Sequence, residues 1–299
     1  MIKQYDLRIG NFKFTYLSEY GENLIRDFNF SWKLDSFSAS YDIDNKNYDF
    51  VYEVKREKKK LTTNKESLIF SEKSGFFEDN IYVNKDGSFN WIFKRIKNEE
   101  EILSYNINKE WNHCKCIYDN TNTGGQFAFE YLSRIISYSM IKNISLVLHG
   151  VLVEYNNKGI IISAPSGTGK TTHARMWRDT HRALIINGDR ALCRKIDNKW
   201  TGFGMPWCGT SGEYINRDVV ISAIVVLEQA KENSVEKLDT LQAFNHMIPN
   251  ITAPTWEKNL LNKAMDYLED IVNEIPVYKL KCTPDIEAVE VLKKEIDKL

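Results

Sequence analysis

The pattern of hydrophobic residues changes near residue 120. Before that point, apolar and aromatic residues form short runs with partial alternation, as at 49–57 (DFVYEVKRE) and 88–96 (SFNWIFKRI). Such runs, rich in β-branched and aromatic side chains, are typical of strands. Asp86 and Gly87 precede the second run and are residue types that a tight hairpin turn prefers. The first part of the chain is therefore predicted to be β-rich.

A cluster of breaker residues, NTNTGG at 120–125, comes next and is predicted to be a hinge or domain boundary. We expect one domain over 1–122 and a second over 123–299. In the second domain, residues 126–141 predict a helix. Its apolar side chains recur at helical spacing, at Phe127, Tyr131, Ile135 and Tyr138.

The pattern after this helix predicts a strand, a turn, a second strand and another helix. Residues 144–155 (ISLVLHGVLVEY) read as one long strand, and NNKG at 156–159 reads as the turn into the strand 160–163. Residues 170–179 (KTTHARMWRD) read as a helix. The predicted fold class is therefore α/β with a mixed sheet, preceded by the β-rich domain.

The segment between the last strand and helix, APSGTGKTTH at 164–173, matches a P-loop with alanine at the first glycine position. Glycines let backbone N–H groups turn toward phosphate oxygens, Lys170 would contact the β- and γ-phosphates, and the Thr171 hydroxyl would bind Mg²⁺. The alternative is a polar turn that starts a helix. The motif predicts ATP and Mg²⁺ as cofactors. The candidate nucleotide-binding residues are Ser166, Gly167, Thr168, Gly169, Lys170, Thr171 and Thr172.

Three further residues are candidates for chemistry. Asp189 follows the hydrophobic strand of ALIINGDR (183–190), and ligands collect at the carboxyl ends of strands in open α/β sheets. It is a candidate Mg²⁺ ligand, general base or both, or else a turn residue. His149 ends the run SLVLH and is either catalytic or structural, whereas His173, within the predicted helix, is expected to be structural.

Composition limits the choice of partners. The formal net charge of −1 argues against general affinity for nucleic acid or a membrane surface, and no apolar run has the length of a membrane helix. Five irregularly spaced cysteines favour reduced thiols and a cytoplasmic protein. HCKC at 113–116 is either a metal half-site or, as we favour, a pair of ordinary buried thiols.

Residues 148–172 (LHGVLVEYNNKGIIISAPSGTGKTT) resemble the catalytic domain of HPr kinase/phosphorylase. The resemblance spans about 126–295. Its later segments are more similar to HPr-kinase-like proteins encoded beside peptide-modifying enzymes, including lasso-peptide serine kinases. The wider fold relative is phosphoenolpyruvate carboxykinase. The resemblance implies a central mixed sheet with the P-loop at one edge, and leaves acceptor recognition to residues 1–122.

Carried over to this sequence, the resemblance implies catalytic roles for Lys170, Asp189 and His149, with Thr171 and Asp189 as metal ligands. His149 occupies the position of the family histidine near the transferred phosphate, and Asp189 that of the second of two acids. Gly188 stands where the first acid is common. In the namesake enzyme that acid is implied as the base for the kinase and the acid for phosphorolysis, so phosphorolysis is in doubt here.

We therefore expect a kinase that transfers the γ-phosphate of ATP to a hydroxyl, with serine of a peptide or protein as the favoured acceptor. The alternatives are a small-molecule kinase, a carboxykinase-like enzyme and a nucleotide-gated peptide-binding module. A homo-oligomer is left open. Arg217 could neutralise transition-state charge or lie on the surface, and Trp207 with Cys208 could line the acceptor pocket or belong to the core.

Overall fold

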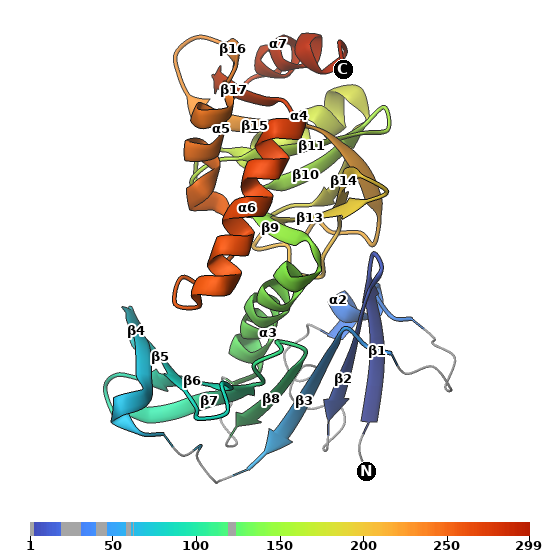
Figure 1. The fold of residues 1–299 in the computed structure, drawn as a ribbon. Coiled ribbons are helices and arrows are strands. Elements are labelled where there is room, and N and C mark those ends of the chain that lie inside the picture. Colours follow the sequence, from blue (N-terminus) through green and yellow to red (C-terminus); the bar gives the residue numbers. More distant parts are fainter. Residues whose placement is uncertain (1–2, 19–30, 40–46, 58–60, 62, 119–123) are drawn as a thin grey trace. The chain divides into compact units, whose positions relative to one another are not determined.

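The computed structural model describes the chain except for residues 1–2, 19–30, 40–46, 58–60, 62 and 119–123. It divides into two compact units, unit 1 (Met1–Ser139) and unit 2 (Met140–Leu299). Each unit contains its own sheet (Figure 1). The division falls before the last residue of the helix α3 (Gly124–Met140), whereas the sequence suggested a boundary before this helix.

Unit 1 contains an eight-stranded sheet in the order β1-β2-β3-β8-β7-β6-β5-β4. The pairs β2–β3 and β3–β8 are parallel and the others are antiparallel. The two strands predicted from the sequence are confirmed as β3 and β6. The strands are β1 (Lys3–Ile9), β2 (Phe12–Ser18), β3 (Phe50–Arg56), β4 (Leu68–Ser74), β5 (Phe77–Val83), β6 (Phe89–Arg95), β7 (Glu100–Ile107) and β8 (His113–Tyr118), with a short helix α2 (Ser31–Asp35).

The helix α3 packs on the unit 1 sheet through aromatic side chains. The Phe127 and Phe93 ring centroids are 4.8 Å apart, and those of Tyr131 and Trp91 are 5.1 Å apart. Asp79 accepts hydrogen bonds from the Tyr131 hydroxyl (2.6 Å) and Trp91 Nε1 (2.7 Å), and burial raises the pKa of its carboxyl. The predicted helix is confirmed, and the aromatic residues at the predicted spacing form the face of the helix that contacts the sheet.

The predicted hinge at 120–125 falls partly outside the described residues, which exclude 120–123. Gly124 and Gly125 belong to α3, because the helix starts before the apolar pattern does.

Cys114 and Cys116 are free thiols and are buried. Burial raises the pKa of both thiols, that of Cys116 to about 12. Both therefore contribute protonated thiols to the unit 1 core.

Unit 2 is a mixed sheet with helices, which confirms the α/β class. The strands run in the order β12-β10-β11-β15-β14-β13-β9, and β17 joins β15 to β16. The strands are β9 (Ser145–His149), β10 (Val151–Tyr155), β11 (Lys158–Ser163), β12 (Leu184–Asn187), β13 (Arg190–Ile196), β14 (Lys199–Phe203), β15 (Asp218–Gln229), β16 (Ser234–Lys237) and β17 (Val277–Cys282). The α-helices are α4 (Lys170–His181), α5 (Thr240–Met247), α6 (Lys258–Glu274) and α7 (Ile286–Ile296).

The hydrophobic core of unit 2 lies between the central strands and two helices. Buried residues of β10, β11, β15 and β17 form one cluster with residues of α4 and α7. Trp177 of α4 is fully buried in it. This packing holds α4, and with it the loop that precedes α4, against the sheet.

Two sequence predictions for unit 2 were wrong. The long strand expected at 144–155 is broken at Gly150 into β9, which pairs with β13, and β10, which pairs with β11 and β12. A Cβ at Gly150 would lie 3.0 Å from the Ile162 carbonyl oxygen, so a larger residue at this bend would require its neighbours to shift. The strand that leads into the P-loop motif, β11, is not at an edge but lies between β10 and β15. Its continuous apolar run is buried on both faces, as an interior strand requires.

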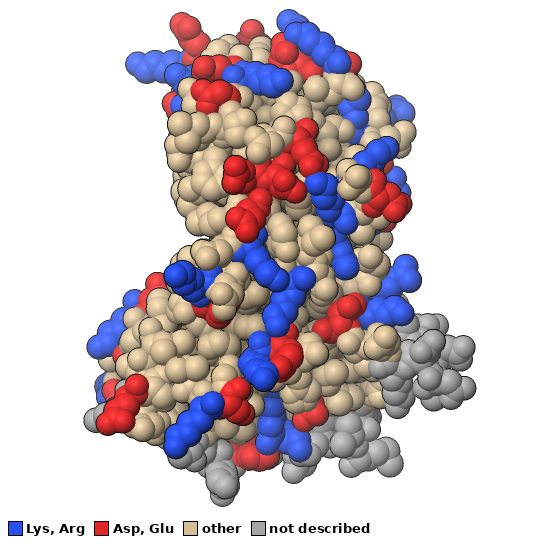
Figure 2. Space-filling view, in the orientation of Figure 1, with Lys and Arg blue, Asp and Glu red and all other residues tan. Residues whose placement is uncertain are grey.

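Charges of both signs are interspersed on the visible surface, and one cluster of acidic residues in unit 2 lies over α6 (Figure 2). Asp266, Glu269, Asp270 and Glu274 of this helix are exposed. Within the described part of the chain, no helix has the length and apolar character needed to cross a membrane.

Candidate functional site

The chain between β11 and α4 forms a loop over residues 164–169, which we call the glycine-rich loop. The φ angles of Gly167 and Gly169 are +79° and +111°, a region that strains residues with a side chain. Gly169 is the N-cap of α4. The backbone N–H groups of the first helical turn therefore lack acceptors within the helix, and the positive end of the helix dipole lies beside them. A loop of this geometry suits an anion.

Lys170 lies at the start of α4 and turns back over the glycine-rich loop. Its ammonium group donates to the carbonyl oxygens of Ala164 (2.7 Å) and Pro165 (3.2 Å). Burial lowers the pKa of Lys170, and the negative charge of Asp189 acts in the opposite direction. The side chain thus holds a cation close to the loop and within the field of one carboxylate.

His149 and Asp189 are brought together at a bend shared by two pairs of strands. The β9–β13 pair contains the partners His149 and Arg190, and the β10–β12 pair contains Leu152 and Asn187. Between these pairs the Gly150 N–H donates to the Asp189 carbonyl oxygen at 2.9 Å. The bend places His149 Nδ1 at 3.5 Å from Asp189 Oδ1. Residues forty positions apart in the sequence therefore meet because both strand pairs bend at one place.

The surroundings of His149 favour its neutral form. Burial and the Lys170 ammonium lower the pKa of His149, while the Asp189 carboxylate opposes them. The other oxygen of Asp189 lies 3.4 Å from Arg190 Nε. The site thus contains the neutral imidazole of His149 next to the Asp189 carboxylate, which also lies near the cations Lys170 and Arg190.

Asn187 holds the bend together and was not among the candidate residues from the sequence. Its side chain is fully buried. Oδ1 accepts hydrogen bonds from the backbone N–H groups of Asp189 (3.0 Å) and Arg190 (2.8 Å). Nδ2 donates to the carbonyl oxygens of Met205 (2.8 Å) and Trp207 (3.1 Å). The residue therefore fixes the backbone of Asp189 and attaches the chain at 205–213 to it.

The segment 205–213, which we call the 205–213 loop, occupies the space beside Gly188. The Ser211 hydroxyl donates to the Cys208 carbonyl oxygen (2.6 Å) and accepts from the Glu213 N–H (3.2 Å). A Cβ at Gly188 would lie 2.6 Å from Ser211 Cβ, far inside contact distance. Ser211 therefore leaves no room for a side chain at position 188.

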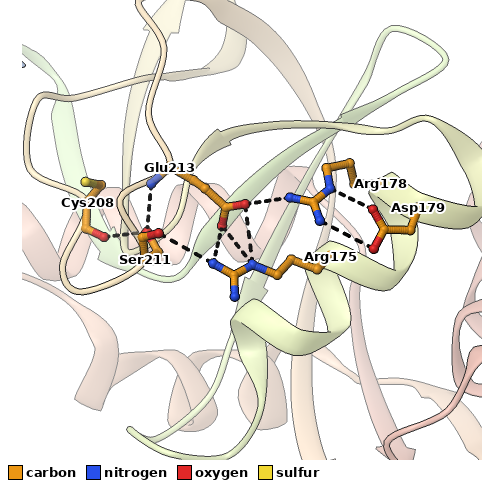
Figure 3. A network of polar contacts seen from close by, with 6 residues as sticks. All are labelled: Arg175, Arg178, Asp179, Cys208, Ser211 and Glu213. Atoms are coloured by element: carbon orange, nitrogen blue, oxygen red, sulfur yellow. Dashed lines mark hydrogen bonds and ion pairs between the residues drawn. The ribbon is translucent and has the colours of Figure 1, made fainter.

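Glu213 connects the 205–213 loop to α4 (Figure 3). Its carboxylate accepts from Arg178 Nη1 at 2.8 Å and from Arg175 Nε and Nη2 at 3.3–3.4 Å. Arg175 Nη2 also reaches the Ser211 carbonyl oxygen at 3.5 Å, and Arg178 makes a second pair with Asp179. The loop is thus tied to the helix that starts at Lys170.

The predicted site residues line two adjoining cavities. The first, of about 290 Å³, brings together the glycine-rich loop, His149, Asp189 and the 205–213 loop. It is lined by His149, Ser166, Gly167, Gly169, Lys170, Thr171, Thr172, Gly188, Asp189, Thr210 and Ser211. The remaining predicted residue, Thr168, lines the second cavity, of about 420 Å³.

Three residues considered for the site lie elsewhere. Arg217 makes an ion pair with Glu154 of β10 and donates to it from Nη2 at 2.8 Å, so its charge is already compensated. Trp207 and Cys208 are each 1% exposed and belong to the core. Asn187, Ser211 and Glu213 were missed because no local pattern marks them, and because the bonds from Asn187 to Met205 and Trp207 and from Glu213 to α4 join distant parts of the sequence.

The fold and this loop define a mixed α/β protein with a strand, glycine-rich loop and helix in sequence. A family model described as SynChlorMet cassette protein ScmC matches residues 126–294, more than half of the chain, and the chain belongs to this family. Among solved structures, it is similar to one titled "Structure of the Hpr(Ser) kinase/phosphatase from Coxiella burnetii", at 9% identity and a TM-score of 0.31. That similarity covers 51% of this chain and 93% of the other. No curated protein matches the sequence.

Gly188→Ala should destabilise the protein, because the new methyl group would collide with Ser211 and force the 205–213 loop outward. Overpacking of this kind costs about 1–3 kcal/mol of unfolding free energy. Chemical denaturation measures the loss. In a Ser211→Gly background the colliding atoms are gone, so the same Gly188→Ala change should cost clearly less. Equal costs in both backgrounds would contradict the steric explanation.

Proposed function

We propose that the protein is an ATP- and Mg²⁺-dependent kinase that transfers the γ-phosphate to a hydroxyl, with serine of a peptide or protein as the acceptor. The observation that supports this most directly is the cavity of about 290 Å³, where the glycine-rich loop, Lys170, Asp189 and His149 meet. Phosphoryl transfer needs positioning and charge neutralisation more than covalent chemistry from the protein. These residue types supply both.

The triphosphate would lie over the glycine-rich loop. Backbone N–H groups and the start of α4 would receive the phosphate oxygens. Lys170 would exchange its contacts with the Ala164 and Pro165 carbonyl oxygens for the more strongly charged β- and γ-phosphates. Ser166 and Thr172 would border the phosphates from the two ends of the loop.

The oxygen donors of the cavity fit Mg²⁺. Thr171 and Asp189 both line it, and Mg²⁺ in nucleotide sites is bound by one or two carboxylates together with substrate phosphates. The described residues contain no cluster of three or more His, Cys, Asp or Glu side chains that would hold an ion alone, so a site shared with phosphate suits them. Bound there, Mg²⁺ would neutralise charge on the transferred phosphoryl group.

His149 is assigned as the base. A carboxylate that holds a cation is a weaker base, because the cation stabilises its ionised form. The neutral imidazole beside it has Nδ1 toward Asp189, which leaves Nε2 for the acceptor. As the acceptor oxygen bonds to the γ-phosphorus, the bond to the bridging oxygen breaks, ADP leaves and the hydroxyl proton passes to His149.

The acceptor is expected to be recognised in part by residues 1–122. All residues that line the cavity come from unit 2, so the cavity accounts for the nucleotide and the reacting hydroxyl but not for binding of a longer peptide. As part of the proposal, recognition of the rest of a peptide acceptor is therefore assigned to unit 1.

Lys170→Ala should abolish transfer and weaken ATP binding, since alanine removes the cation that faces the β- and γ-phosphates. Isothermal titration with ATP and a phosphoryl-transfer assay check this. Lys199→Ala removes an exposed lysine from the start of β14 and serves as the control with the same loss of charge. Wild-type affinity and turnover in Lys170→Ala would refute the phosphate-binding role of the glycine-rich loop.

Asp189→Asn should leave the fold intact and lower the transfer rate by about two or more powers of ten, through loss of the metal ligand and of the charge that orients His149. Single-turnover rates at saturating Mg²⁺ measure it. Asp197→Asn makes the same change in the β13–β14 turn, outside the cavity, and should be neutral. A near-normal rate in Asp189→Asn would show that Asp189 takes no part in transfer and is only a turn residue.

The transfer rate should fall on acidification only below pH 6.5. The pKa of His149 lies below its ordinary value of about 6.5, so the neutral form that accepts the proton persists at neutral pH and is lost only as pH falls through that lowered pKa. His149→Ala should lower the rate roughly 100-fold or more and remove this acid limb. His246→Ala, on the exposed side of α5, is the control and should keep the limb. Persistence of the limb in His149→Ala would assign the base to another group.

A further inference from the structure

The second cavity adjoins the first along the glycine-rich loop and the start of α4. It has a volume of about 420 Å³ and shares Gly167, Gly169 and Thr172 with the first cavity. Its walls include the apolar side chains of Met176, Leu227 and Pro284. Ligand pockets for flat organic groups combine apolar walls with a few placed polar atoms. A molecule in this cavity would be continuous with phosphates in the first.

One polar side chain at this cavity, that of His173, is buried and incompletely bonded. The residue is 1% exposed. Trp177 Nε1, which can only donate, lies 3.2 Å from His173 Nε2. Nε2 must therefore carry a lone pair, and the ring proton must be on Nδ1. Burial lowers the pKa of His173 to about 4, so the ring is neutral at neutral pH.

The proton on Nδ1 has no acceptor. Nδ1 is a buried nitrogen for which the described residues offer no hydrogen-bond partner. A buried donor without an acceptor is destabilising, and nearly all such groups in proteins are paired. Two other polar side chains at the cavity are already engaged: Gln229 Nε2 donates to the Thr168 carbonyl oxygen (3.1 Å), and Thr283 Oγ1 bonds to Asn233 and Asp285.

We propose that the second cavity binds the nucleoside of the phosphoryl donor and that His173 Nδ1–H donates a hydrogen bond to an acceptor atom of that nucleoside. The inference rests on the proposed function, because it places the donor's phosphates in the first cavity. It adds a residue that the sequence pattern assigned to structure alone. It also gives the orphan N–H an acceptor, while Met176, Leu227 and Pro284 cover the base.

The test compares two ligands and two substitutions. ATP carries the nucleoside, and inorganic tripolyphosphate carries only the phosphates. His173→Gln keeps an acceptor for Trp177 near the position of Nε2 but loses the donor near Nδ1. His173→Asn keeps a donor near Nδ1 but loses the acceptor for Trp177. Affinities for both ligands are measured by isothermal titration with the full chain at saturating Mg²⁺, and Lys170→Ala serves as the variant that should lose both ligands.

His173→Gln is expected to weaken ATP binding by about tenfold, the effect of one buried hydrogen bond, and to leave tripolyphosphate binding unchanged. His173→Asn should bind ATP nearly as the wild type does. Unchanged tripolyphosphate binding also shows that α4 and its loop remain folded, so His173→Gln decides the matter even if His173→Asn is unstable. Wild-type ATP affinity in His173→Gln, or equal losses for both ligands, would overturn the inference.

The failure of this inference can be separated from failure of the proposed function. A wild-type protein that binds ATP and tripolyphosphate equally tightly keeps the phosphate site but has no nucleoside site, which overturns the inference alone. A wild-type protein that binds neither ligand overturns both.

Discussion

The buried side-chain amide of Asn187 is the interaction on which the candidate site depends. It bonds to two N–H groups at the start of β13 and to two carbonyl oxygens in the 205–213 loop. Because the amide is fully buried, loss of these bonds would leave its own polar atoms unpaired, at about 1–3 kcal/mol apiece. One side chain therefore holds the backbone of Asp189 and the backbone at Met205 and Trp207 together.

Besides the Asn187 hydrogen bonds, the packing of α4 on the sheet and the ion pairs of Glu213 hold the two loops of the site in place. The glycine-rich loop is fixed by β11 and by the packing of α4 on the sheet, where Trp177 is fully buried. The 205–213 loop is held to α4 by Glu213, whose pairs with Arg175 and Arg178 are partly exposed and thus individually weak. The same loop is also anchored by Trp207 and Cys208, which are buried in the core, and by the two bonds from Asn187. Both sides of the cavity are therefore fixed by buried contacts, and the ion pairs of Glu213 add to those on the side of the 205–213 loop.

The sequence predicts the parts of the site that are local. Strand, glycine-rich loop and helix follow one another without interruption, so periodicity and glycine positions were enough to place β11 and α4. The 3.5 Å approach of His149 to Asp189 is not local, because it needs the bend at Gly150 that divides the predicted strand into β9 and β10. Apolar residues on both sides of Gly150 hide that bend. Only the tertiary fold reveals that β11 has neighbours on both sides.

The lack of space beside Gly188 limits which residues can take part in the proposed reaction. Ser211 fills the space that a side chain at Gly188 would need, so two acids cannot stand side by side at this bend. In the proposed kinase, metal binding and proton transfer then fall to residues on different strands, Asp189 after β12 and His149 at the end of β9. A residue that removes the acceptor proton in the forward direction must return it in reverse. A neutral histidine of lowered pKa accepts a proton less readily than an unshifted one, and once protonated it is the stronger acid. Such a base returns its proton readily, which keeps it from accumulating as the charged form next to Lys170.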